Sequence, residues 1–221
     1  MTSSAAKQLI IDAFIEEVEA GSLRSVQIAK LIKKLDINRN TFYYHFTSKY
    51  DVALHVFRTD LARELTDSFP AYELVSLALD DGPKAEALPY YVHREIGART
   101  LDFGDFFKAL VRCVLGREAF YRKLFDQRET EFRSLVFELY QQAVGSDLEF
   151  MLGGRYLPPP TFEYFRHQYT ELIYDTAAYC LRHSRDARNM LDNTVNPFWN
   201  MPYEALVHAI QSHPIKRPRS A

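Results

Sequence analysis

The chain has 221 residues, of which 47% are hydrophobic and 25% are charged, with a net charge of −2. This composition is typical of a globular protein that buries a real core. No run approaches the roughly 18 apolar residues of a membrane span, and the opening residues lack a basic start followed by an apolar segment. We therefore expect a cytoplasmic protein with no membrane partner.

Charge is distributed unevenly along the chain. Residues 1–58 hold eight basic against six acidic residues, whereas the remainder holds 19 basic against 23 acidic residues. A short basic stretch on a mildly acidic body suits one surface that faces a polyanion, although charge runs are usually solvated helix faces. Cys113 and Cys180 have no metal-ligand spacing, so we expect reduced thiols packed as small hydrophobes and no metal site.

Apolar residues recur with a helical period along the chain, and no segment sustains the alternation expected of a strand. The pattern therefore predicts an all-α fold. It places a first helix over 5–20 and a second over about 28–35. Gly21 is well placed to end the first helix in the left-handed backbone conformation.

The second helix is followed by a turn over 36–38, in which Asp36 is expected to adopt the left-handed backbone conformation. Asn38 is a good N-cap for a third helix, on which Phe42 and Phe46 lie one turn apart on the buried face. Thr47-Ser48 caps a fourth helix, which is predicted from Lys49 to about Phe69 and is stopped by Pro70.

Beyond Pro70 the pattern stays helical. The predicted helices cover about 72–80, 85–97, 105–115, 117–127, 129–144, 161–184 and 202–212. Residues 185–201 are expected to form a loop and the basic tail, 213–221, to be disordered. The prediction is a three-helix domain over 1–58, joined by a long helix to a C-terminal helical domain over 59–212.

A short helix, a three-residue turn and a second short helix on one apolar face make up a helix-turn-helix arrangement. Residues 37–51, INRNTFYYHFTSKYD, resemble the signature of the TetR family, in which an aromatic run of this kind is followed by Ser-Lys. The resemblance covers about residues 7–57 and is dense over 37–51. It departs from the family pattern at Asp36, where Gly is usual, and at Gln27, where Ser or Thr is usual.

The resemblance implies a helix-turn-helix regulator that reads double-stranded DNA as a homodimer, with the third helix in the major groove. Arg39 is then expected to bond guanine, Asn40 adenine, and the Thr41 methyl group to touch thymine. The other expected DNA contacts are Gln27, Lys30, Asn38, Tyr43, Tyr44, His45 and Lys49, the last as a phosphate clamp. The alternative is that 27–49 is a compact helical corner with solvated basic side chains.

The resemblance also implies that the C-terminal domain dimerises through its last two long helices and encloses a small apolar or aromatic effector. The candidate interface residues are Phe165, Tyr169, Leu172, Ile173, Leu206 and Ile210. The candidate effector residues are Phe103, Phe106, Phe107, Phe120, Tyr121, Phe125 and Phe137. Aromatic stripes at helical spacing more often form a core, so both interpretations of these residues stay open.

Three functions compete on the sequence alone. The first is a transcriptional regulator, a repressor, whose affinity for DNA is changed by an effector. The second is a DNA-organising or protein-interaction module that has no small-molecule inducer. The third is an enzyme, but Gly153-Gly154 lacks the spacing of a phosphate loop, and no nucleophile elbow or zinc-binding histidine pair is present. We therefore expect no catalysis and no cofactor.

Overall fold

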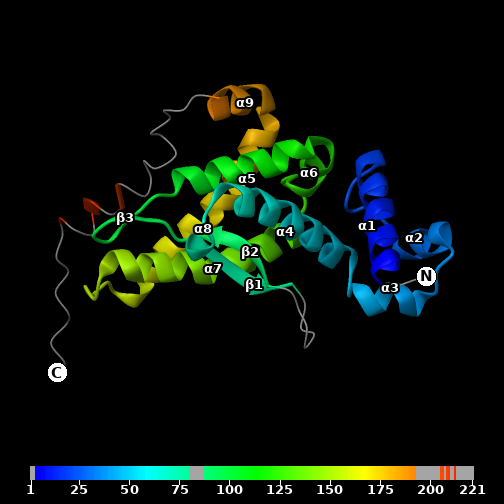
Figure 1. The fold of residues 1–221 in the computed structure, drawn as a ribbon, viewed down its shortest axis with the longest axis horizontal. Coiled ribbons are helices and arrows are strands. Elements are labelled where there is room, and N and C mark those ends of the chain that lie inside the picture. The colour runs from blue at the N-terminus through cyan, green and yellow to red at the C-terminus, as the bar shows by residue number, and fades with distance from the viewer. Residues whose placement is uncertain (1–2, 80–86, 193–204, 207, 210–211, 213–221) are drawn as a thin grey trace.

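The computed structural model describes residues 3–79, 87–192, 205, 206, 208, 209 and 212. Helices dominate these residues (Figure 1): α1 (Ser3–Ala20), α2 (Ile28–Leu35), α3 (Arg39–His45), α4 (Lys49–Ser68), α5 (Gly104–Gly116), α6 (Glu118–Leu124), α7 (Thr130–Leu152), α8 (Pro159–Arg182) and α9 (Ser184–Asp192). A short 3-10 helix, Ala71–Glu73, leads into four strands: β1 (Leu74–Ala78), β2 (Ala87–Val92), β3 (Glu95–Gly97) and β4 (Thr100–Leu101). Within the described ranges, no helix is long and apolar enough to cross a membrane.

The N-terminal helices α1, α2 and α3, with the start of α4, form a small bundle that we call the head; the rest of the protein is the body. Three local predictions for the head are confirmed. Asp36 adopts the left-handed conformation at φ 49° and ψ 42°. The Asn38 Oδ1 atom accepts a hydrogen bond from the Asn40 N–H at 2.9 Å, and Ser48 Oγ accepts one from the Asp51 N–H at 3.1 Å. The caps therefore fix the start of α3 and the start of α4.

The end of α1 differs from the prediction in one respect. Gly21 does not have a positive φ; its N–H donates to the Val18 carbonyl at 3.2 Å instead. A Cβ atom at position 21 would lie only 2.7 Å from Ser25 Oγ. Ser25 Oγ in turn accepts the Ser22 N–H at 3.0 Å, so the turn is compact. Glycine is required here because a side chain would clash with Ser25, and not because the backbone is left-handed.

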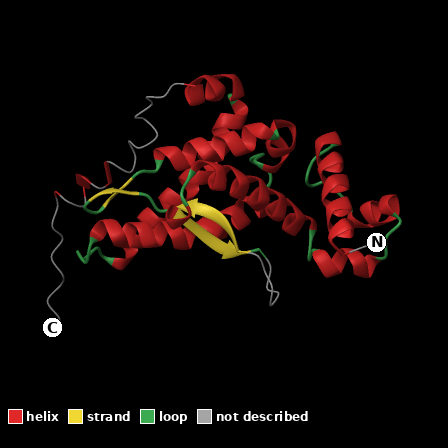
Figure 2. Ribbon diagram, viewed as in Figure 1, coloured by secondary structure: helices red, strands yellow, loops and turns green. Residues whose placement is uncertain are grey.

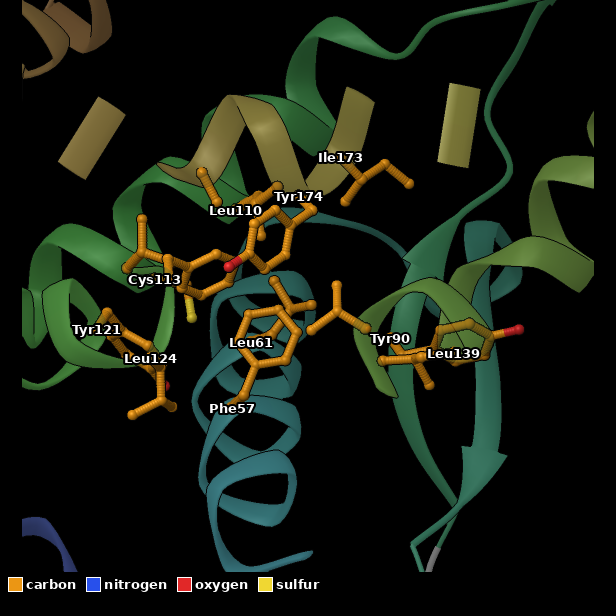
Figure 3. Close-up of a cluster of buried hydrophobic side chains, with 14 of the residues drawn as sticks. Phe57, Leu61, Tyr90, Leu110, Cys113, Tyr121, Leu124, Leu139, Ile173 and Tyr174 are labelled. Atoms are coloured by element: carbon orange, nitrogen blue, oxygen red, sulfur yellow. The ribbon is translucent and has the colours of Figure 1, made fainter. Parts of the chain in front are cut away.

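Helix α4 continues from the head into the centre of the body. Figure 3 shows Phe57 and Leu61 of α4 among side chains of α5, α6 and α8 on one side, and Tyr90 and Leu139 on the other. The Phe57 ring makes edge contacts with Phe125 at 5.8 Å and Tyr121 at 6.1 Å between centroids. The two cysteines are free and buried, as predicted. Helix α4 thus contributes buried side chains to the core of the head and to the core of the body.

Two segments predicted as helices, 72–80 and 85–97, contain strands instead. β1 and β2 pair antiparallel, with Leu74 opposite Val92 and Ala78 opposite Ala87. β3 and β4 form a second, shorter antiparallel pair. Figure 2 shows both pairs as small ribbons among the helices. The fold is therefore mostly helical and not all-α.

The way β2 is buried explains why periodicity failed to reveal it. Tyr90, Tyr91 and Val92 are consecutive and all buried, so the strand lacks the alternation of a half-exposed one. Pro89 faces Ser76, where the pairing register shifts. Proline donates no ladder hydrogen bond and is tolerated at such irregularities, whereas it breaks a helix interior.

Two further boundaries in the body differ from the prediction. α7 continues past residue 144 to Leu152 and ends at Gly153, which caps it at φ 54°. α9 occupies part of the segment 185–201 that was predicted as a loop, and it buries Ala187. The remainder of that segment, the tail 213–221 and most of the predicted helix over 202–212 lie outside the described residues.

A buried carboxylate attaches the hairpin of β1 and β2 to α7. Asp147 on α7 is 2% exposed, accepts a hydrogen bond from Tyr91 Oη at 2.8 Å, and pairs with His93 Nδ1 at 2.6 Å. This bond to Asp147 is the main cause that raises the pKa of His93, with Glu95 acting in the same direction. Burial raises the pKa of Asp147. The hairpin is therefore held most strongly when His93 is protonated.

We expect this attachment to weaken as pH rises. Because the folded pKa of His93 lies above its unfolded value of about 6.5, its contribution is complete below that value and is lost as pH rises through the folded pKa. His93→Leu should lower the free energy of unfolding by about 1–2 kcal/mol near pH 6 and by less at alkaline pH. Urea unfolding across pH measures this, with His167→Leu, an exposed histidine, as control. An equal His93 effect at every pH would contradict the assignment.

Candidate nucleic-acid interface

Helix α3 turns its polar residues to solvent. Asn38, Arg39 and Asn40 are exposed and Thr41 is half-buried. Tyr43 and Tyr44 are 44% and 78% exposed. On the opposite side Phe42 and Phe46 are buried and anchor α3 to the head. A helix held by one apolar face, with its N-terminal polar groups free, has the form needed to enter a major groove.

Contacts within α3 orient its polar groups. The Arg39 guanidinium stands 5.4 Å from the centre of the Tyr43 ring, a cation–π distance that favours a defined side-chain direction. Asn38 uses its side-chain oxygen to cap the helix, so only its amide N–H groups remain for another partner. The first turn of α3 contains no acidic residue. The N-terminal end of α3 therefore favours an anion.

The side chains at α2 that could contact the DNA backbone differ in whether they already have partners within the protein. Gln27 precedes α2 without a side-chain capping bond, and both Gln27 and Lys30 are exposed. Lys34, by contrast, pairs with Glu16 at 3.1 Å and with Glu17 at 3.2 Å on α1. Gln27 and Lys30 are thus open to a phosphate, whereas Lys34 already has partners.

His45 and Lys49 are less open than the sequence suggested. His45 is half-buried, and burial, with a smaller effect of nearby Lys7, lowers its pKa. Lys49 donates from Nζ to the carbonyl oxygens of Arg24 at 2.8 Å and Val26 at 3.3 Å. Burial lowers the pKa of Lys49 as well. The ammonium group of Lys49 is therefore directed at the loop between α1 and α2.

A hollow of about 470 Å³ beside α3 includes a residue that the sequence did not single out. Its walls include Lys7 together with Tyr44, His45 and Thr47. The Lys7 ammonium lies 5.6 Å from the centre of the Phe46 ring. Lys7 is the only basic residue of α1 and shares the helical phase of the buried Ile10 and Phe14. That phase was the available signal that Lys7 lies toward α3.

The comparison with known families decides the nature of the head. The model of a family described as bacterial regulatory proteins, tetR family, matches residues 10–56. The matched span contains α2 and α3, the later part of α1 and the first turns of α4. Residues 10–56 form a tetR-family helix-turn-helix domain. The match indicates a family of DNA-binding transcriptional regulators. No curated protein matches the chain.

The seven candidate effector residues lie within the body. Phe103, Phe106, Phe107, Phe120, Tyr121 and Phe125 are buried, and Phe137 is half-buried. Phe120 contacts Phe14 at 6.2 Å, and Phe106 contacts Phe107 at 5.6 Å between ring centres. Tyr121 Oη donates to Asp60 at 2.8 Å. This mutual packing accounts for their burial without any ligand.

The candidate dimer residues fall into two groups. Phe165, Tyr169 and Leu172 are half-buried on one stripe of α8, which Tyr179, 54% exposed, continues. Ile173 and Leu206 are buried within the chain itself. Ile210 lies outside the described residues. Among the described candidates, the first group offers surface to a partner, whereas Ile173 and Leu206 do not.

The left-handed residue of the turn supplies a stability test of the head. A non-glycine residue at the positive φ of Asp36 is strained, and we expect Asp36→Gly to raise the free energy of unfolding by up to about 1 kcal/mol. Asp12→Gly, inside the exposed face of α1, should lower it by about 0.5–1 kcal/mol. Thermal or urea unfolding measures both. A loss of stability from Asp36→Gly would show that the aspartate side chain itself holds the turn.

Proposed function

We propose that this protein is a sequence-specific transcriptional regulator that binds a pseudo-palindromic operator as a homodimer. The observation that carries the proposal is the exposed N-terminal end of α3 within a tetR-family head. Arg39 and Asn40 are long enough to reach base edges and are exposed. Arginine pairs with guanine and asparagine with adenine in the major groove. Thr41, Tyr43 and Tyr44 would complete the contacts to bases and phosphates.

Dimerisation is part of the proposal because a single head of this size offers few base contacts. Two heads placed about one helical turn of DNA apart read two half-sites. The stripe of Phe165, Tyr169 and Leu172 on α8 supports this, since it is apolar and partly exposed. Helices that pack across a twofold axis would cover it.

We propose repression as the mode of action, because occupancy of a promoter alone blocks transcription, whereas activation requires a further contact with the polymerase. A small apolar or aromatic effector that releases the DNA belongs to the same proposal. A hollow of about 280 Å³ between the hairpin and α7, lined by Tyr90, Tyr91 and Asp147 among others, supports it. Its lining combines two tyrosines and aliphatic side chains with polar ones, and small-molecule sites likewise combine apolar walls with polar groups that orient the ligand.

The wall of that hollow is connected to the helix that carries the head. Arg58 of α4 is buried and donates from its terminal nitrogens to the carbonyls of Leu77 and Ala78, the latter at 2.8 Å. An occupant that displaced β1 would therefore act directly on α4. A ligand shifts an equilibrium only when it binds one arrangement better than the other.

The alternative function is a DNA-organising or protein-interaction module without an inducer. Selection of binding sequences from a fragmented genomic or random pool, at physiological salt, tests the two against each other. Enrichment of an inverted repeat with half-sites about one helical turn apart supports the regulator. A correctly folded dimer that enriches no sequence would favour the alternative.

We expect Arg39→Ala and Asn40→Ala to weaken binding to the selected sequence by about 1–3 kcal/mol for each lost base contact. Binding to random DNA should change little. Fluorescence anisotropy with matched cognate and random duplexes measures both. Lys34→Ala serves as control, since its ammonium is already paired with α1. Equal losses on both duplexes would mean that Arg39 and Asn40 contact only the DNA backbone.

The dimer proposal has its own test. Leu172→Glu places a charge in the apolar stripe of α8 and should shift the protein from dimer to monomer, with loss of tight binding to the two-half-site duplex. Sedimentation velocity measures the mass. Gln168→Glu, exposed on the same helix, adds the same charge and should leave the dimer intact. A dimeric Leu172→Glu protein would place the interface elsewhere.

A further inference from the structure

The hollow of about 470 Å³ beside α3 lies where the head meets the body. The head contributes residues of α1, α3 and the first turns of α4 to its walls. The body contributes Ala78 at the end of β1, Leu79, which directly follows it, and Leu135 of α7. The volume is in the range of small-molecule sites. This hollow shares no lining residue with the one at the hairpin, so the two are separate.

Three basic side chains of the walls surround the ring of Phe46. The Lys7 ammonium of α1 lies 5.6 Å from the centre of this ring. The His55 ring of α4 lies 5.4 Å from it, and the His45 ring at the end of α3 lies 6.5 Å from it, between centres. All three are half-buried and line the hollow. Folding of the head thus brings basic groups of three helices to one place.

The charges around the hollow favour an anion. Within the described residues, Lys7 and His45 pair with no carboxylate. The acid among the described lining residues is Asp51, whose Oδ2 accepts the Thr47 N–H at 2.8 Å and the Thr47 hydroxyl at 3.2 Å. Burial, with a smaller effect of Lys7, lowers the pKa of His45. A concave surface whose uncompensated charge is positive concentrates anions.

The hollow also has apolar walls. Leu54 of α4, Leu79 and Leu135 are half-buried and line it from three elements. The wall at the end of β1 is fixed, because the Ala78 carbonyl accepts a hydrogen bond at 2.8 Å from Arg58, a buried residue of α4. Apolar walls with a few polar groups are what an organic ligand requires. A phosphate of the DNA backbone would use the cations and leave the leucines uncovered.

We propose that this hollow is a binding site for a small organic acid that has an apolar chain or ring. Lys7 and His45 hold the carboxylate, and the three leucines contact the apolar part. Such a ligand touches the head and the body at once, and it therefore joins α3 to α7 without any covalent connection. The site goes beyond the proposed function, whose effector lies at the hairpin, and its existence does not depend on DNA binding.

Octanoate serves as the probe, titrated by calorimetry into the full-length protein without DNA. It should bind saturably and raise the melting temperature. 1-Octanol has the same chain without the charge, and inorganic phosphate has charge without the chain. Each should bind at least about tenfold more weakly than octanoate, because each lacks one half of the interactions. No saturable binding of octanoate, or equal binding of either comparison compound, would overturn the proposal.

Variants place the probe in this hollow. Lys7→Met keeps the length of the side chain and removes its charge, so it should weaken octanoate binding at least about tenfold. Lys33→Met, exposed on α2 and outside the hollow, should leave binding unchanged. Leu135→Glu brings a carboxylate into the hollow from the body and should abolish binding, while melting curves show that the fold persists. Unchanged octanoate affinity in both Lys7→Met and Leu135→Glu would overturn the site.

Salt dependence distinguishes this ligand from a DNA phosphate at Lys7. Each phosphate contact contributes about 0.9 to the slope of log K against log salt for double-stranded DNA. Lys30→Met, exposed on α2, should lower the magnitude of this slope by about 0.9, whereas Lys7→Met should leave it unchanged. A slope lowered as far in Lys7→Met would overturn the assignment of Lys7. The proposed function fails separately, if the wild-type protein enriches no sequence, and the octanoate result stands without it.

Discussion

The structure depends on one continuous helix, α4, that belongs to two cores at once. Its first turns, which Ser48 caps, bury Val52 and Ala53 in the head, and its later turns bury Phe57, Leu61 and Leu65 in the body. An α-helix is stiff over such a length, so the two cores cannot reorient independently at this junction. Any rearrangement of the body that tilts α4 is therefore a rearrangement of the head. The non-covalent contact between α1 and α6 acts in addition to this constraint.

Buried polar groups on α4 determine how the rest of the body is placed around it. Asp60 accepts from Tyr121 Oη at 2.8 Å and from Arg117 Nε at 3.2 Å, which fixes α6. Arg58 bonds the end of β1, and its Nε has no hydrogen-bond partner in the described part of the chain. Apolar packing tolerates sliding, whereas a misplaced buried charge loses its partners at considerable cost. We infer that these two residues select one position of α6 and of the hairpin.

The sequence predicted the head because its signals are local. A cap, its acceptor and the helix they start lie within a few residues, as at Asn38 and Ser48, and helix phase alone exposes Arg39 and Asn40. The hairpin was mispredicted because Tyr90, Tyr91 and Val92 are buried without alternation, which periodicity cannot distinguish from a helix. The partners of Lys49 were not predicted, because they are carbonyls 25 and 23 residues away in sequence, which no local pattern encodes.

Because α3 is short, its orientation depends on the helices against which it packs. The helix has seven residues, too few to be stable alone, and it is anchored by Phe42 and Phe46. The direction in which Arg39 and Asn40 point is therefore set by α1 and α2, against which α3 packs, and by the contact of Phe46 with His55 of α4; α1 and α4 both contact the body. Base recognition tolerates little displacement of a hydrogen-bonding side chain. A small tilt of α4 would therefore change the direction of Arg39 and Asn40 relative to the body without unfolding any element.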